Sequence, residues 1–274
     1  MIIGITGYSG FIGKHLVDHL SKIQSADIVL IGRKPPREKY IYHDYFDFQS
    51  KKNSKLKVDV LIHLAGVTKV SEESNLIEFN FNYEGTKKLI ESYDFDHILF
   101  TSTLKAGGSD VEYNSMELSY IQSKLKAENL IKSLDKRFTI LRLGHCYGKY
   151  DLGDRLIPTI LKASKEKKYL QLKLNPFSQL SFLSADDFSK IVEPLIFEKS
   201  SHNQTVNIYN PDYIYVSDII NTIHGITSIF CLKASNNYPI IKQFELDISS
   251  NFLIKDHKFA EFKSELNKIW NCLR

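Results

Sequence analysis

The stretch GITGYSGFIGKHL, residues 4–16, decides the fold of this chain. It places Gly7, Gly10 and Gly13 at intervals of three, between an apolar run and an amphipathic one. The apolar run predicts a short buried strand, and the apolar positions that follow at helical spacing predict a helix. A strand, a glycine turn and a helix in this order form a phosphate-binding site, because the helix N-terminus presents free N–H groups and a partial positive charge.

Each glycine has a separate role in such a turn. Gly7 allows the tight bend, Gly10 lets a pyrophosphate approach the backbone, and Gly13 lets the helix pack closely on the strand. The spacing is Gly-x-x-Gly-x-x-Gly rather than Gly-x-Gly-x-x-Gly. Its place at the first strand of an alternating pattern is the context that supports a dinucleotide site.

The chain continues as an alternation of apolar runs and amphipathic segments. Such alternation predicts an α/β fold with a doubly wound parallel sheet of the Rossmann type. We expect strands over residues 1–6, 27–32, 59–66, 97–103 and 138–144, and helices over 11–23, 74–92 and 119–134.

The pattern becomes irregular after Gly148, which predicts a second, smaller lobe. We expect a dinucleotide-binding domain over 1–148, to which 182–209 return. Residues 149–181 and 210–274 then form a mixed substrate-binding lobe.

Composition excludes several classes of protein. The net charge of +4 over 274 residues is too small to indicate a nucleic-acid partner, but it suits an anionic small molecule. The three cysteines show no metal or disulfide spacing, so we expect no metal and a reducing, cytoplasmic setting. The glycine stretch leaves no room for a signal peptide, and no apolar run approaches the ~18 residues of a membrane span.

The segment TGYSGFIG resembles the first turn of the extended short-chain dehydrogenase/reductase superfamily, in its sugar-nucleotide epimerase, dehydratase and ketoreductase branch. The resemblance extends to about residue 210. It implies a nicotinamide dinucleotide above the glycines and a nucleotide-sugar substrate. It also allows a homodimer, because members often pair through helices that flank the sheet.

The pattern Tyr-x-x-x-Lys occurs four times, and its context selects Tyr120 and Lys124. They lie early in the helix after the strand HILFTST, on one helix face. The segment SYIQSKLKAE also resembles the active-site helix of the extended branch. A phenol has a pKa of about 10 in water, and a nearby ammonium lowers it. Tyr120 is therefore the expected proton donor or acceptor for hydride transfer, and Lys124 would also hold the nicotinamide ribose.

A hydroxyl at the end of the preceding strand should bind the substrate oxygen. The segment TST (101–103) offers candidates, and the register of the resemblance favours Thr103 over Ser102. The resemblance also assigns cofactor contacts to Phe11, Ile12, Asp44, Leu64, Ala65, Gly66, Asn82, Leu143 and Gly144. It places His145 beside the substrate. The stretch QLSFLSADD lacks the arginine that often clamps the substrate pyrophosphate in this family, so we expect Arg155 or Lys173 to replace it.

The end of the second strand predicts the choice of cofactor. An acidic residue there binds the adenine-ribose hydroxyls of NAD and repels the extra phosphate of NADP. DIVLIGRKP has Gly32 at this position, followed by Arg33, whose guanidinium suits a phosphate. We therefore expect NADP(H) to be preferred, with NAD(H) as the alternative.

Three functions remain open from the sequence. The first is an NADPH-dependent reductase of a nucleotide-linked keto-deoxysugar, which the short second lobe, Arg33 and the stretch ELDIS (245–249) favour. The second is an NAD-dependent nucleotide-sugar epimerase or dehydratase. Dehydratases commonly follow the catalytic threonine with Asp-Glu, whereas Leu104 and Lys105 follow here, which argues against dehydration. The third is a non-catalytic NADP-binding sensor or scaffold, which the intact Tyr120–Lys124 pair disfavours.

Overall fold

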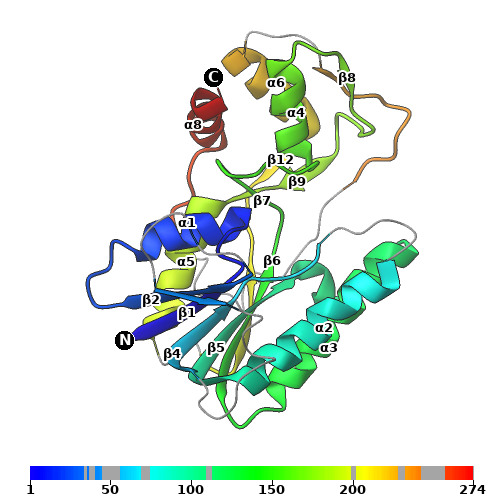
Figure 1. The fold of residues 1–274 in the computed structure, drawn as a ribbon. Helices are drawn as coiled ribbons and strands as arrows, with labels where there is room; N and C mark the ends of the chain where they lie inside the picture. Colours follow the sequence, from blue (N-terminus) through cyan, green and yellow to red (C-terminus); the bar gives the residue numbers. More distant parts are fainter. Residues whose placement is uncertain are drawn as a thin grey trace. The chain divides into compact units, whose positions relative to one another are not determined.

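The structure, a computed structural model, divides into two compact units (Figure 1). One unit comprises Met1–Leu143 and Ser189–Ile208, and the other comprises Gly144–Phe188 and Tyr209–Arg274. The residues that the structure describes are 1–33, 36, 41–44, 56–68, 75–108, 113–198, 202–227, 232–241 and 257–273.

The first unit is built on a parallel sheet with the strand order β11-β6-β5-β4-β1-β2-β3. This order, which runs outward from β1 in both directions, confirms the predicted doubly wound α/β fold. The strands are β1 (Ile2–Thr6), β2 (Asp27–Gly32), β3 (Ile41–Asp44), β4 (Leu56–His63), β5 (Tyr93–Thr103), β6 (Arg137–Leu143) and β11 (Gln204–Ile208).

Helices cover both faces of this sheet (Figure 1). Helices α1 (Phe11–Leu20) and α5 (Ala185–Phe197) lie on one face, where His19 Nε2 contacts Glu193 Oε2 at 2.6 Å. Helices α2 (Asn75–Ser92) and α3 (Ser115–Lys132) lie on the other. Apolar side chains of the inner strands are buried on both sides, as expected of a sheet between two helical layers.

The second unit has its own apolar core. Helices α4 (Leu156–Lys165), α6 (Val216–Thr227) and α8 (Phe262–Leu273) supply most of its buried side chains. Short strand pairs complete it: β7 (Cys146–Tyr147) with β10 (Leu183–Ser184), β9 (Gln179–Ser181) with β12 (Tyr213–Tyr215), and β8 (Leu170–Gln171) with β13 (Leu232–Lys233).

The boundaries of the units differ by a few residues from those expected. The first segment ends at Leu143 rather than 148, and the returning segment begins at Ser189 rather than 182. The reason lies in residues 182–187. Phe182 packs in the core of the second unit, and Asp187 accepts hydrogen bonds from Ala260 N at 3.0 Å and contacts His257 Nε2 at 3.2 Å.

Within the described ranges, no helix is both long and apolar enough to span a membrane. The same ranges contain no cluster of three or more His, Cys, Asp or Glu side chains suited to a metal ion.

Candidate active site

The glycine turn joins β1 to α1 through very close backbone packing. Gly7 has φ +70°, a region that favours glycine, and a Cβ atom there would lie 2.6 Å from Ala65 N. A Cβ atom on Gly13 would overlap the Gly7 carbonyl oxygen. These two glycines therefore set the bend and the approach of the helix, as the sequence predicts.

The N-terminus of α1 fits a dinucleotide phosphate. Its N-cap is the exposed Gly10, no side chain caps the helix, and its first turn carries no acidic residue. A Cβ atom on Gly10 would contact only the Gly7 carbonyl oxygen, at 3.2 Å. The amides of Phe11 and Ile12 begin the helix beside this glycine, so the backbone N–H groups at the positive end of the helix dipole have no competing carboxylate in the first turn.

A buried chain of hydrogen bonds fixes the neighbouring strand end. Ala65 N donates to Thr6 Oγ1 at 3.2 Å, and Thr6 Oγ1 lies 2.7 Å from His63 Nδ1. On the other side of the ring, His63 Nε2 lies 2.9 Å from Thr86 Oγ1, which donates to the Asn82 carbonyl at 2.6 Å. Thr86 thus accepts from His63, so the imidazole carries a proton on Nε2. Burial, with the charge of Lys124, lowers the pKa of His63 to about 3.

Asn82 locks the segment that follows β4. Its amide donates to Val67 O and to Ser123 Oγ, both at 3.0 Å, and its Oδ1 accepts from Val67 N at 2.7 Å. Asn82 therefore ties the loop Leu64–Val67 to α3. Because both ends of its amide bond to protein groups, Asn82 acts as a structural support of this loop.

Tyr120 and Lys124 lie one turn apart on α3, whose start is fixed by a capping box between Asn114 and Glu117. Lys124 is buried, donates to Thr101 O at 3.0 Å, and lies 4.9 Å above the Phe100 ring. A Cβ atom on Gly66 would come within 3.0 Å of Lys124 Nζ. The glycine that ends HLAG thus lets the ammonium reach the strand-end loop.

Burial shifts both groups of this pair away from their charged forms. It raises the pKa of Tyr120 to about 12. It lowers the pKa of Lys124 to about 8, although the charge of Glu128 opposes this change. Tyr120 therefore needs positive charge beyond that of Lys124 to ionise near neutral pH.

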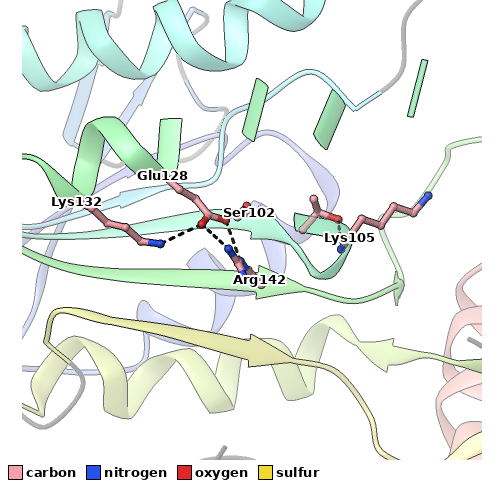
Figure 2. Close-up of polar contacts among 6 residues, drawn as sticks. Ser102, Lys105, Glu128, Lys132 and Arg142 are labelled. Carbon is pink, nitrogen blue, oxygen red and sulfur yellow. Dashed lines mark hydrogen bonds and ion pairs between the residues drawn. The ribbon is translucent and has the colours of Figure 1, made fainter. Parts of the chain in front are cut away.

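The two candidate hydroxyls have different partners. Ser102 donates to Glu128 Oε1 at 2.6 Å (Figure 2). Among the described residues, the bond found for Thr103 Oγ1 is a long one of 3.4 Å, which it accepts from Lys105 N. Both side chains are buried. Thr103 ends β5 and is the better candidate for a substrate contact, because the Ser102 proton is already committed to a carboxylate.

Glu128 is a buried anion that sequence reasoning did not single out. Arg142 binds it through Nε and Nη2 at 3.0 and 2.8 Å, and Lys132 approaches at 3.3 Å (Figure 2). Burial tends to raise the pKa of Glu128, but the hydrogen bonds from Arg142 and Ser102 and the nearby cations lower it overall. This cluster ties α3 to β5 and β6. The sequence feature that could have indicated this cluster is the spacing of four between Lys124 and Glu128, which places both on one face of α3.

The end of β2 carries no acid. Gly32 pairs with Asp44 of β3, and Arg33 follows as an exposed side chain. The side chain of Asp44 lies outside the described residues, as does the stretch 245–249.

The remaining predicted residues divide between the units. Leu143 ends β6 opposite Thr103, whereas Gly144, His145 and Arg155 belong to the second unit. His145 is exposed, and its carbonyl accepts from Leu183 N at 2.8 Å. Arg155 forms an ion pair with the buried Asp151, with Nε 3.0 Å from Oδ2, so its charge is largely compensated.

Comparison with known proteins places the chain in a family. A model of the NAD dependent epimerase/dehydratase family matches residues 3–210. The dTDP-D-glucose 4,6-dehydratase of Dictyostelium discoideum is 26% identical over 267 residues, which cover 81% of this chain and 61% of that protein. The chain thus spans less than two thirds of the length of the curated relatives it matches.

Solved structures share the fold over the whole chain. The UDP-glucuronic acid 4-epimerase of Bacillus cereus, in complex with UDP-glucuronic acid and NAD, matches with a TM-score of 0.81 and 20% identity, covering 100% of this chain and 99% of that one. The UDP-glucose 4-epimerase of Thermotoga maritima, with UDP-glucose, matches with a TM-score of 0.78 and 18% identity, covering 100% and 98%. Since the family model spans well over half of the sequence, this chain belongs to the NAD-dependent epimerase/dehydratase family.

Proposed function

We propose that this protein is an NAD(P)-dependent enzyme that oxidises and reduces a nucleotide-linked sugar, with epimerisation as its overall reaction. The observation that carries the proposal is the buried Lys124 ammonium, which lies one turn after Tyr120, donates to Thr101 O and is close to Gly66. A bound nicotinamide dinucleotide supplies the hydride acceptor and donor. The Gly10 helix terminus would hold its phosphates, and Lys124 its nicotinamide ribose.

The chain's own residues account for the proton transfer. Tyr120 takes the proton of a sugar hydroxyl during oxidation and returns it during reduction. Burial raises its pKa to about 12 with Lys124 already in place, so ionisation near neutral pH requires the further positive charge that a bound nicotinamide would add. Thr103, at the end of β5, holds the same sugar oxygen by a hydrogen bond. Ser102 stays bound to Glu128 and supports the strand end.

Epimerisation is favoured over the net reduction that the sequence first indicates. The structures with the same fold named above are epimerases, one of them solved with NAD. Dehydration is disfavoured by the residues after Thr103. Leu104 is buried, and Lys105 Nζ contacts Glu117 Oε1 at 2.5 Å, so neither offers an acid–base pair. Reduction with NADPH stays a second candidate, because the end of β2 lacks the acid that favours NAD.

The test is the nucleotide that the purified protein carries, followed by a substrate screen. We expect protein denatured after purification to release NAD or NADP in near-stoichiometric amount, and UDP- or dTDP-sugars to be interconverted without added cofactor. Tyr120→Phe is the matched control, because it should retain the nucleotide and lose the conversion. Net consumption of added NADPH with a keto-sugar would favour the reductase. Cofactor binding without turnover of any nucleotide sugar would favour a sensor.

A further inference from the structure

The ring of Tyr8 fills the space that a side chain at position 32, where the chain has glycine, would need. Tyr8 belongs to the glycine turn and is 8% exposed. A Cβ atom on Gly32 would lie 2.7 Å from Tyr8 Cε1 and 3.5 Å from both its Cζ and its hydroxyl oxygen. In the parallel pairing of β1 with β2, Thr6 lies opposite Ile31, so Gly32 at the end of β2 lies beside the turn that follows β1 and contains Tyr8. Both residues belong to the first unit.

This contact forbids side chains at a position where dinucleotide-binding folds usually carry one. Separations under 3.0 Å between such carbon atoms do not persist, so even alanine at position 32 requires the ring to move. An aspartate or glutamate requires more room still. Moving the ring costs its buried packing, and it exposes apolar area at the edge of the phosphate site.

We propose that Tyr8 is a specificity-determining residue of the cofactor site, because its ring excludes an acidic side chain from the end of β2. The adenine ribose then meets an uncharged aromatic edge and the exposed cation of Arg33 instead of a carboxylate. A 2′-phosphate is consequently not repelled. The inference rests on the proposed function in one respect, namely that a nicotinamide dinucleotide binds above the glycine turn.

The proposal predicts strong coupling between positions 8 and 32. We suggest measuring the dissociation constants of NADH and NADPH by fluorescence titration for the wild type, Gly32→Asp, Tyr8→Ala and the double variant, each stripped of nucleotide. Wild type should bind NADPH more tightly. Gly32→Asp alone should weaken both cofactors, and the double variant should prefer NADH. The ratio of the NADPH to the NADH dissociation constant should change in the double variant by at least about tenfold (~1.4 kcal/mol) more or less than the two single changes together predict.

A second background separates the ring from its hydroxyl. Tyr8→Phe keeps the ring, so Tyr8→Phe/Gly32→Asp should behave like Gly32→Asp and should not gain NADH preference. If Tyr8→Phe/Gly32→Asp prefers NADH, which is the result expected only of Tyr8→Ala/Gly32→Asp, the steric argument is overturned.

Thermal unfolding without cofactor tests the contact directly. Gly32→Ala should lower the melting temperature in the wild-type background and lower it less in the Tyr8→Ala background. This readout stands if an aspartate variant fails to fold. Equal losses in both backgrounds, or affinity effects that add within about twofold, overturn the role of Tyr8. A wild type that binds neither cofactor overturns the proposed function instead.

Discussion

Replacing Glu128 by glutamine should destabilise the protein far more than its single charge suggests. The carboxylate is 1% exposed and accepts from Arg142 and Ser102, so the variant leaves a guanidinium that is only 17% exposed without its anion. Removing one partner of a buried ion pair costs about 3–5 kcal/mol. With a urea slope of about 1–3 kcal/mol per molar, a loss of ~3 kcal/mol lowers the unfolding midpoint by at least ~1 M.

The matched control lies in the same cluster. Lys132 contacts Glu128 at 3.3 Å but is 36% exposed, so Lys132→Met should cost no more than about 1 kcal/mol. Urea titration followed by far-ultraviolet circular dichroism measures both variants. Equal midpoint shifts for Glu128→Gln and Lys132→Met would show that the buried pair with Arg142 contributes nothing special, and the reasoning would fail.

The same variant has a predictable pH dependence. The folded-state pKa of Glu128 is lowered from 4.5, mainly because the bonds from Arg142 and Ser102 outweigh burial. A lowered carboxyl pKa contributes stability that is present above the ordinary pKa and is lost as the pH falls through the folded-state value. The gap between wild type and Glu128→Gln should therefore be constant from pH 7 to about 5.5 and shrink below about 4.5. A gap that widens in acid would contradict the assignment.

Three further outcomes are expected. Tyr120→Phe should lower turnover at least about 100-fold while cofactor binding persists, and near-normal turnover in a steady-state assay would remove Tyr120 from the mechanism. Thr103→Ala should lower turnover more than Ser102→Ala, whereas Ser102→Ala should lower the urea midpoint more; the reverse order of turnover would make Ser102 the substrate ligand. Arg33→Ala should weaken NADPH binding by about 1.5–3 kcal/mol and leave NADH binding nearly unchanged in direct titrations, and equal losses would show that Arg33 does not bind the 2′-phosphate.

The alternating core of the fold is predictable from the sequence because local signals and tertiary contacts agree there. The range 27–32 is the strand β2, and the helix expected over 74–92 is α2, Asn75–Ser92. Two strands, β4 and β5, begin earlier than expected, since polar residues such as Lys57 and Asp94 interrupt the apolar runs near their starts. Strand β3 was not foreseen, because a short edge strand carries little periodic signal.

The glycine turn of the candidate site was predictable, because closely spaced glycines between a strand and a helix are an uncommon pattern. The Tyr120–Lys124 pair stays a prediction, since Tyr-x-x-x-Lys occurs four times and only its place on the helix after β5 selects this copy. The partners that orient them were not predictable, because a glutamate in a helix usually faces solvent and only the fold brings Glu128 against Arg142. The same holds for Arg155. The sequence suggests that its cation binds a phosphate, whereas in the structure it forms an ion pair with Asp151, four residues earlier.

The hydrogen-bond chain through His63 keeps the same protonation state across the physiological pH range. The hydroxyls of Thr6 and Thr86 each accept one hydrogen bond and donate another. All the bonds of the chain therefore point the same way, from the Ala65 amide to the Asn82 carbonyl. If His63 Nδ1 also carried a proton, both Nδ1 and the Ala65 amide would donate to Thr6 Oγ1, and Thr6 could no longer donate to His63. With a pKa of about 3, His63 stays neutral throughout the physiological range. The ends of β1 and β4 therefore keep one arrangement of protons over the pH range in which Lys124, with a pKa of about 8, changes its charge.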